Sequence, residues 1–127
     1  MIRIKHLMDN VETGDGERLF VEPYGLTKDL TEWCAVNHVV PHLGPPKELA
    51  DWFEEHPDGY EFFRARYHEV LQKSPMKPAL QQLACVAARE TFTLLHTGDD
   101  PAHNTATALY EFITELEAYC PPEQPEQ

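Results

Sequence analysis

Residues 91–113 read TFTLLHTGDDPAHNTATALYEFI, and this stretch decides the fold because it joins a buried strand, a polar turn and a helix. The strand is predicted over residues 92–95, where apolar and β-branched side chains fall on both faces, as in the centre of a sheet. Asp99 and Asp100 supply oxygens that can cap a helix, and Pro101 suits a first helical position, so the helix is expected to begin at Asp100 or Pro101. Ligands usually bind at such strand-to-helix junctions in open α/β sheets.

His103 and Asn104 fall in the first turn of the predicted helix, off the apolar stripe that packs it on the sheet. Two interpretations stay open for them: contact with a ligand, or hydrogen bonds that only brace the turn. Asp99 precedes His103 by four residues, so the two can form an acid–imidazole pair that orients the ring and raises its proton affinity. Simple capping by Asp99 is the alternative.

The other elements are predicted from their periodicity and from the breakers between them. They are strands over residues 2–7, 18–22 and 33–40, and helices from Pro46 through His56, from an Asp58 cap over residues 60–71, and from Leu80 to about Glu90. The aromatic residues at helical spacing in 60–71 are interpreted as core and not as a cofactor cradle. This order predicts an α/β fold, a single compact domain with a mainly parallel sheet of about four strands covered by about four helices.

Length and hydropathy place the chain among single-domain globular proteins. Its 127 residues suit one domain, predicted over residues 1–119, and residues 120–127, rich in Pro, Glu and Gln, are expected to be a disordered tail. No stretch approaches the roughly 20 apolar residues of a membrane span, and the N-terminus lacks the apolar segment of a signal peptide. A cytoplasmic location without membrane attachment is therefore expected.

Charge and cysteine usage exclude several classes of protein. With 22 acidic and 10 basic residues the net charge is −12, which repels phosphate backbones, so broad nucleic-acid binding is not expected. Cys34, Cys85 and Cys120 are odd in number and widely spaced, so they are interpreted as buried thiols and not as a disulfide framework or a zinc site. Four basic residues close together in the sequence are interpreted as solvated helix charges, namely Arg64, Arg66, Lys73 and Lys77.

Common catalytic and cofactor motifs are absent from the sequence. It lacks GxxxxGKS/T, GxGxxG, GxSxG and HExxH, so no cofactor and no catalytic residue is assigned. His38 and His42, with His6 as a third ligand, form the one suggestive metal set. Pro41 interrupts regular strand geometry between the two, and no carboxylate or cysteine completes the set, so no metal site is predicted.

Several segments resemble the DUF488 family, in its small YeaO-like branch. They are IRIKHL, the Asp15-Gly16 turn before RLFVE, GLTK, ELADWFEEHPDGYEFFRARYHEVL and LLHTGDDPAHNTATAL, and the match runs over about residues 1–117. His103 and Asn104 stand where that branch carries its HN dipeptide. The resemblance implies a compact α/β domain of uncharacterised biochemical role, for a family with no established reaction.

One segment departs from the pattern of these relatives. They usually carry a VDRLWPRG-like sequence after the second strand, whereas this chain has Val21-Glu22-Pro23-Tyr24-Gly25-Leu26, with both arginines and the tryptophan gone. If those arginines bind an anionic substrate, this protein has lost the groups that would neutralise it. Activity by the mechanism presumed for the family is therefore not expected.

Three hypotheses for the function follow. The first is a DUF488-like domain that binds a small polar ligand or a protein partner at the carboxyl edge of its sheet without catalysis. The second is an enzyme acting on a nucleotide or other small polar substrate, with His103 as acid/base and Asp99 orienting it. The third is a structural homodimer subunit that pairs through the valine-rich residues 36–40. The residues expected around the pocket, with Glu22 and His103 converging on one cleft, are Glu22, Tyr24, His96, Asp99, His103 and Asn104.

Overall fold

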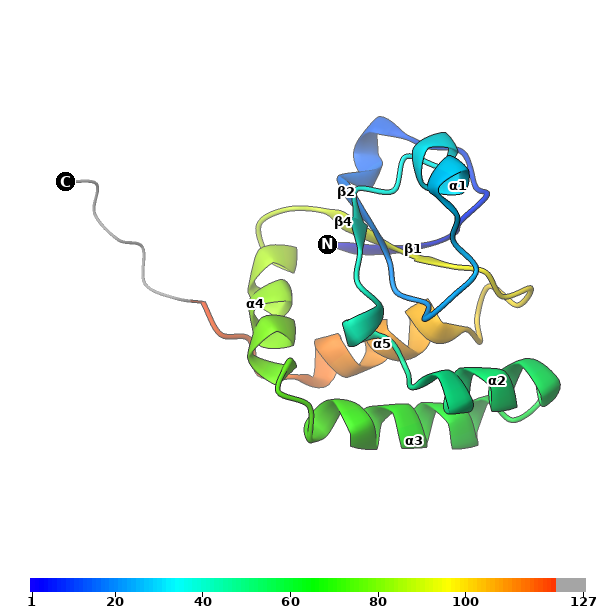
Figure 1. Cartoon of the computed structure of the whole chain (residues 1–127). Coiled ribbons are helices and arrows are strands. Elements are labelled where there is room, and N and C mark those ends of the chain that lie inside the picture. The colour runs from blue at the N-terminus through cyan, green and yellow to red at the C-terminus, as the bar shows by residue number, and fades with distance from the viewer. Residues whose placement is uncertain (121–127) are drawn as a thin grey trace.

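The centre of the molecule is a four-stranded parallel sheet in the order β1-β4-β2-β3 (Figure 1). The computed structural model describes residues 1–120. The strands are β1 (Ile2–His6), β2 (Glu17–Phe20), β3 (His38–Val39) and β4 (Phe92–His96), and every pairing between them is parallel. The predicted α/β class with a mainly parallel sheet in one compact domain is confirmed.

Strand β4 lies between β1 and β2, and all five of its residues are buried. Leu94 pairs with Ile4 of β1 on one side and with Leu19 of β2 on the other. The prediction of a central strand here is therefore confirmed. Because the strands are parallel, the chain leaves β2 and β4 at the same edge of the sheet, and the polar segments that follow them are brought together there.

Helices cover the sheet on both faces. Figure 1 shows α1 (Lys28–Trp33) on one side of the sheet and α2 (Lys47–Glu55), α3 (Tyr60–Gln72) and α5 (Thr105–Glu115) on the other, with α4 (Lys77–Ala87) joining α3 to β4. Two short 3-10 turns, η1 (Thr13–Asp15) and η2 (Pro41–Leu43), complete the described elements. The larger core lies beneath α5 and includes Phe63, Tyr67, Leu94 and Leu109; Leu7, Phe20, Cys34 and Leu95 form a smaller cluster.

The prediction of a third strand over residues 33–40 is mostly wrong. Only His38–Val39 is strand, and Trp33 ends α1. None of the residues of α1 is buried, so its sequence carries no apolar stripe that could reveal it. Its start is fixed locally, since Thr27 Oγ1 accepts a hydrogen bond from Leu30 N at 3.1 Å.

The predicted start of the last helix is also wrong, because α5 begins at Thr105 and not at Asp100 or Pro101. Asn104 is the N-cap, and its Oδ1 accepts a hydrogen bond from Thr107 N at 2.8 Å. Asp100 caps a separate tight turn, where its Oδ1 accepts from Ala102 N at 2.8 Å. His103 and Asn104 therefore precede the helix instead of lying in its first turn.

Two other helix ends differ from expectation. The N-cap of α3 is Gly59, with no side-chain cap hydrogen bond, and the predicted cap Asp58 lies exposed before it. A Cβ on Gly59 would come 2.4 Å from Trp52 Cη2, so close packing against α2 sets this turn. Helix α4 ends at Ala87, somewhat before the predicted Glu90.

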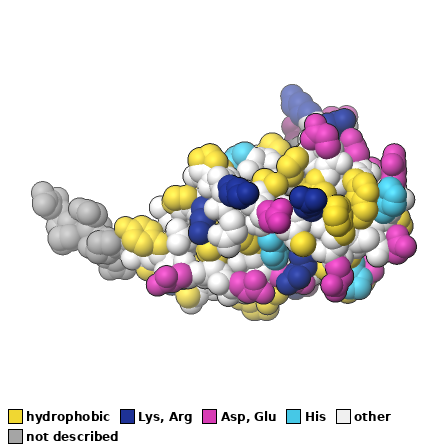
Figure 2. Space-filling view, turned by 90° about the horizontal axis from the view of Figure 1, so that it is seen from below, with side chains coloured by type: hydrophobic (Ala, Val, Ile, Leu, Met, Phe, Trp, Pro, Cys, Tyr) yellow, Lys and Arg dark blue, Asp and Glu magenta, His cyan; other side chains and the backbone are white. Residues whose placement is uncertain are grey.

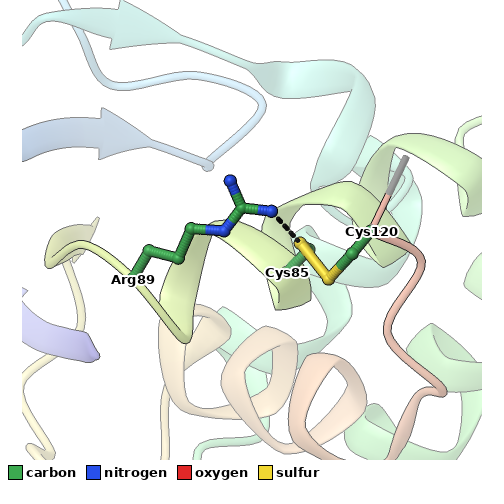
Figure 3. The surroundings of a disulfide bond; sticks show 3 residues. All are labelled: Cys85, Arg89 and Cys120. Carbon is green, nitrogen blue, oxygen red and sulfur yellow. Dashed lines mark hydrogen bonds between the residues drawn. A yellow bond between two sulfur atoms is a disulfide. The ribbon is translucent and has the colours of Figure 1, made fainter. Parts of the chain in front are cut away.

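The interpretation of all three cysteines as thiols is wrong for two of them. Cys85 on α4 and Cys120 form a disulfide with Cα atoms 5.3 Å apart (Figure 3), while Cys34 is a free, buried thiol. The two partners are 35 residues apart, and they meet because α4 packs against α5 and the chain after α5 returns to α4. Cys120, the first residue of the predicted tail, is thus bonded to the domain, and the rest of that prediction lies outside the described residues.

Within residues 1–120 no helix has the length and apolar character needed to cross a membrane.

Candidate functional site

A cavity of about 500 Å3 opens at the carboxyl edge of the sheet. Its walls come from the segment after β2, from the loop between β4 and α5, and from α2. Glu22 and His103 both line it, as expected for residues that follow parallel strands. Five of the six residues predicted around the pocket are in its lining, namely Glu22, Tyr24, Asp99, His103 and Asn104.

Glu22 is a partly buried carboxylate in this wall. Burial raises its pKa, and the nearby charge of Glu54 raises it further. Hydrogen bonds from Thr105 and Thr97 act in the opposite direction. Burial therefore makes the negative charge of Glu22 costly, and a positive group beside it would relieve that cost.

Tyr24 is held as a hydrogen-bond donor. Its hydroxyl donates to Asp51 Oδ1 at 2.7 Å and lies 3.2 Å from Glu54 Oε2, both on α2. Burial and these two carboxylates raise the pKa of Tyr24 well above its ordinary value, so the phenol stays protonated. These bonds tie the segment after β2 to α2 and so shape one side of the cavity.

His103 is paired with Asp100 and not with Asp99, so the predicted Asp99–His103 pair is wrong. His103 Nδ1 lies 3.0 Å from Asp100 Oδ2, and its ring lies against Tyr60 with centroids 4.7 Å apart. The backbone N–H of Ala102 and then His103 lower the pKa of Asp100. The imidazole is exposed at the cavity mouth, where it can meet a ligand.

Asn104 is a bracing residue. Its Oδ1 accepts from Thr107 N, and its Nδ2 donates to Asp100 O at 2.9 Å. The side chain is almost completely buried and joins the tight turn to the start of α5. Of the two interpretations left open by the sequence, hydrogen bonding within the turn accounts for the side-chain contacts of Asn104.

His96 is the predicted residue that the structure does not bring to this cavity. It lines a separate cleft of about 350 Å3 beside β1, together with His6 and Asp9. Its Nδ1 accepts from Gly98 N at 3.1 Å. Burial and the neighbouring His6 lower the pKa of His96 to about 4, so the ring is neutral at pH 7. The ring of His96 lies against that of His6 on β1, with centroids 5.4 Å apart, so the side chain belongs to the cleft beside β1.

Sequence reasoning missed nine of the fourteen lining residues, among them Phe53, Glu54 and Asp100. Phe53 and Glu54 come from α2, and Asp100 was assigned only to capping. Nothing in the helical pattern of α2 reveals which of its residues faces a loop far along the chain. The doublet Asp99-Asp100 did mark the turn, but it could not show which of the two carboxylates meets His103.

The three histidines considered as metal ligands do not converge. His38 is on edge strand β3 and lies 3.6 Å from Glu17, whereas His6 is on the opposite edge strand β1. Among residues 1–120 no group of three or more His, Cys, Asp or Glu side chains is placed to hold a metal ion.

The family follows from comparison with known proteins. The family model described as the inactive DUF488-N3 subclade matches residues 1–124. The chain belongs to the DUF488 family. The resemblance seen in the sequence is thereby confirmed, while the YeaO-like branch stays a prediction.

Curated relatives of this DUF488 domain are mycobacterial. Uncharacterized proteins of Mycobacterium tuberculosis and Mycobacterium bovis are 26% identical to it over 118 residues, which cover 88% of this chain and 92% of theirs. No solved structure matches the chain significantly.

The charge of the DUF488 cavity is one-sided. Four carboxylates line it, and neither Lys nor Arg is among its lining residues, all of which lie in the described part of the chain. The segment after β2 supplies Glu22, Tyr24 and Gly25 to this wall. The four carboxylates belong to Glu22, Glu54, Asp99 and Asp100.

Proposed function

We propose that this DUF488 domain binds a small, positively charged organic molecule in the cavity at the carboxyl edge of its sheet and carries out no reaction on it. The observation that carries the proposal is a cavity of about 500 Å3 lined by four carboxylates and by no Lys or Arg within the described residues. Such a lining attracts cations and repels phosphates and carboxylates. The cavity is of the size typical of small-molecule sites.

The lining suits an ammonium group carried on an apolar chain. Glu22 is the most buried of the four carboxylates, and burial raises its pKa, so a positive group beside it would be stabilised. Phe53, Ala50 and Pro57 supply apolar surface for the rest of the molecule. Aromatic faces also attract cations, which adds to the preference.

Binding without chemistry is favoured over the acid/base hypothesis. His103 has a carboxylate partner, Asp100, as a general base would need. However, the cavity offers no Lys or Arg among the described residues to stabilise negative charge that develops in a reaction. The description of the matching subclade as inactive supports the same choice.

The hypotheses of a protein partner and of a homodimer are supported by the exposed edge of the sheet at β3. The edge strand β3 is only two residues long, and Val39 on it and Trp33 before it are exposed, so a protein partner or a second copy can meet the domain there. We propose no nucleic-acid surface at the four basic residues of the region 64–77, Arg64, Arg66, Lys73 and Lys77, because acidic side chains are interspersed with them. Figure 2 shows acidic side chains between and around the basic ones on the face seen from below, and Arg64 pairs with Glu111. The cytoplasmic location stays a prediction.

Amide NMR titration with ligands of equal carbon length tests the proposal that the cavity binds a positively charged molecule. Putrescine, a diamine, is expected to shift the signals of Gly25 and Gly98 in the cavity wall and to bind more weakly as salt is added. Butanediol and succinate, which replace the amines by hydroxyls and carboxylates, are expected to leave these signals in place. Shifts with succinate but not with putrescine would overturn the charge preference, and the absence of shifts with all three would overturn the proposed site.

A matched pair of variants checks that Glu22 is the residue involved. Glu22→Gln is expected to weaken putrescine binding by roughly 10- to 100-fold, because a hydrogen bond to a charged partner contributes about 1.5–3 kcal/mol. Glu117→Gln removes the same charge from an exposed position outside the cavity lining, and it is expected to bind almost as the natural protein does. Equal weakening in both variants would show that only net charge matters.

A further inference from the structure

The disulfide joins a buried residue to an exposed one. Cys85 lies on α4 with 4% of its surface exposed, whereas Cys120 is exposed in the segment after α5. An external thiol can therefore approach from the side of Cys120, while Cys85 is shielded. Exposed disulfides exchange with thiols far more readily than buried ones.

A cation lies beside the shielded sulfur. Arg89 follows Cys85 by one helical turn, and its Nη2 donates a hydrogen bond to Cys85 Sγ at 3.5 Å (Figure 3). The guanidinium is charged at every relevant pH. A positive group at hydrogen-bond distance stabilises a thiolate relative to a thiol, so Cys85 is the better leaving group of the pair.

We propose that the Cys85–Cys120 disulfide is a thiol-exchange site for low-molecular-weight thiols, with Cys120 as the sulfur that is modified and Cys85 as the sulfur that is released. This inference does not depend on the function of the cavity. It assigns a covalent modification site to a part of the chain that lines neither of the two clefts described above.

The exchange has two balanced steps. A thiolate attacks Cys120 Sγ, a new S–S bond forms to the incoming sulfur, and the bond between Cys120 and Cys85 breaks with its electron pair left on Cys85 as a thiolate beside Arg89. A second thiolate then attacks the sulfur of the bound reagent, releases Cys120 as a thiolate and leaves as the oxidised reagent. The protein gains two electrons, and the two thiols lose them.

The first step removes the covalent link between the end of the described chain and α4. The disulfide and a hydrogen bond from Tyr119 N to Gln81 O at 3.2 Å hold this segment to α4. Leu116, just after α5, still packs on the core, so the helix itself stays in place. Modification therefore changes the surface of α4 and the path of the C-terminal segment while the fold is retained.

Mass mapping with reduced glutathione tests which sulfur is modified. The oxidised full-length protein is treated with excess glutathione, quenched with acid and mapped by peptide mass. The expected first product carries glutathione on Cys120 and a free thiol on Cys85. Glutathione on Cys85, or a disulfide that stays intact after prolonged treatment, would overturn the proposal.

The rate of this first step tests the role of Arg89. Arg89→Gln is expected to slow the release of Cys85 several-fold, since a thiolate that lacks a neighbouring positive charge has a higher pKa and leaves more slowly. Arg66→Gln on α3 removes the same charge elsewhere and is expected to exchange at the natural rate. Circular dichroism checks that both variants are folded. Equal rates in Arg89→Gln and the natural protein would show that Arg89 does not stabilise the leaving thiolate.

Discussion

The strongest stability prediction concerns Asp15, a buried carboxylate surrounded by cations. Arg18 Nη1 donates to Asp15 Oδ2 at 2.6 Å, Lys5 Nζ lies 3.1 Å from the same oxygen, and Arg3 Nη1 lies 3.1 Å from Oδ1. The side chains of Asp15 and Arg18 are 1% and 2% exposed. Burial raises the pKa of Asp15, but hydrogen bonds from Glu12 N, Lys5 and Arg18 outweigh it and leave the pKa below its ordinary value.

Asp15→Asn removes the charge that compensates the buried guanidinium. Arg18 Nη2 is already without a hydrogen-bond partner among the described residues. In Asp15→Asn the buried guanidinium would also lose the negative charge that now compensates its positive charge. Breaking one partner of a buried ion pair costs about 3–5 kcal/mol. An unfolding entropy of about 2.1 cal/mol/K per residue amounts to roughly 0.27 kcal/mol/K for 127 residues, so Tm is expected to fall by about 11–19 °C.

Thermal and urea unfolding measure this loss against two matched variants. Asp58→Asn removes an exposed carboxylate and is expected to change the free energy of unfolding by less than about 0.5 kcal/mol. Asp15→Asn/Arg18→Met removes both buried charges and is expected to be more stable than Asp15→Asn alone. The reasoning is refuted if Asp15→Asn costs less than about 1 kcal/mol, or if the double variant is no more stable than Asp15→Asn.

The stabilisation by Asp15 also has a predicted pH dependence. Its folded pKa lies below its unfolded value, so the unfolded chain binds the proton more readily. The stabilisation is therefore complete above the ordinary pKa of 3.8 and is lost as the pH falls below it. Urea unfolding of natural protein and Asp15→Asn should converge at low pH, and a constant difference between them would contradict this assignment.

Three further changes have defined outcomes. The pKa of His96 is lowered from 6.5 to about 4, so the natural protein should lose about 3 kcal/mol of stability as the pH falls through this range. His96→Asn keeps an acceptor for Gly98 N–H and should not lose this stability. If both proteins lost stability in parallel in urea unfolding, the assignment would be contradicted. Asn104→Ala should cost about 2 kcal/mol through the lost cap on Thr107 N, and unchanged urea unfolding would exclude this role. Glu22 has a raised pKa, so Glu22→Gln should raise Tm at pH 7, with the gain disappearing as the pH falls toward 4.5; no gain at any pH would show that its charge is not costly.

The sequence alone predicted the features that depend on local pattern. The apolar residues around Leu94 predicted a central strand, because a strand covered on both faces needs apolar side chains on both. The order of strands and helices predicted a parallel sheet, and a parallel sheet brings the ends of neighbouring strands to one edge. That is why the sequence alone could assign Glu22, Tyr24 and His103 to one cavity.

Only the tertiary structure decided features that depend on which distant surfaces meet. Asp100 and Asn104 are both good caps, and the choice of Asn104 depends on its burial beneath the turn and its bond to Asp100 O. No residue of helix α1 is fully buried, and Leu30 is the residue of α1 that packs on the smaller cluster, so no apolar stripe predicted this helix. Cys85 and Cys120 are 35 residues apart and meet because α4 packs on α5. Residue spacing in the sequence reveals local periodicity, but the packing of elements sets the distances between them. That packing determines the disulfide and the part of the cavity wall that α2 supplies.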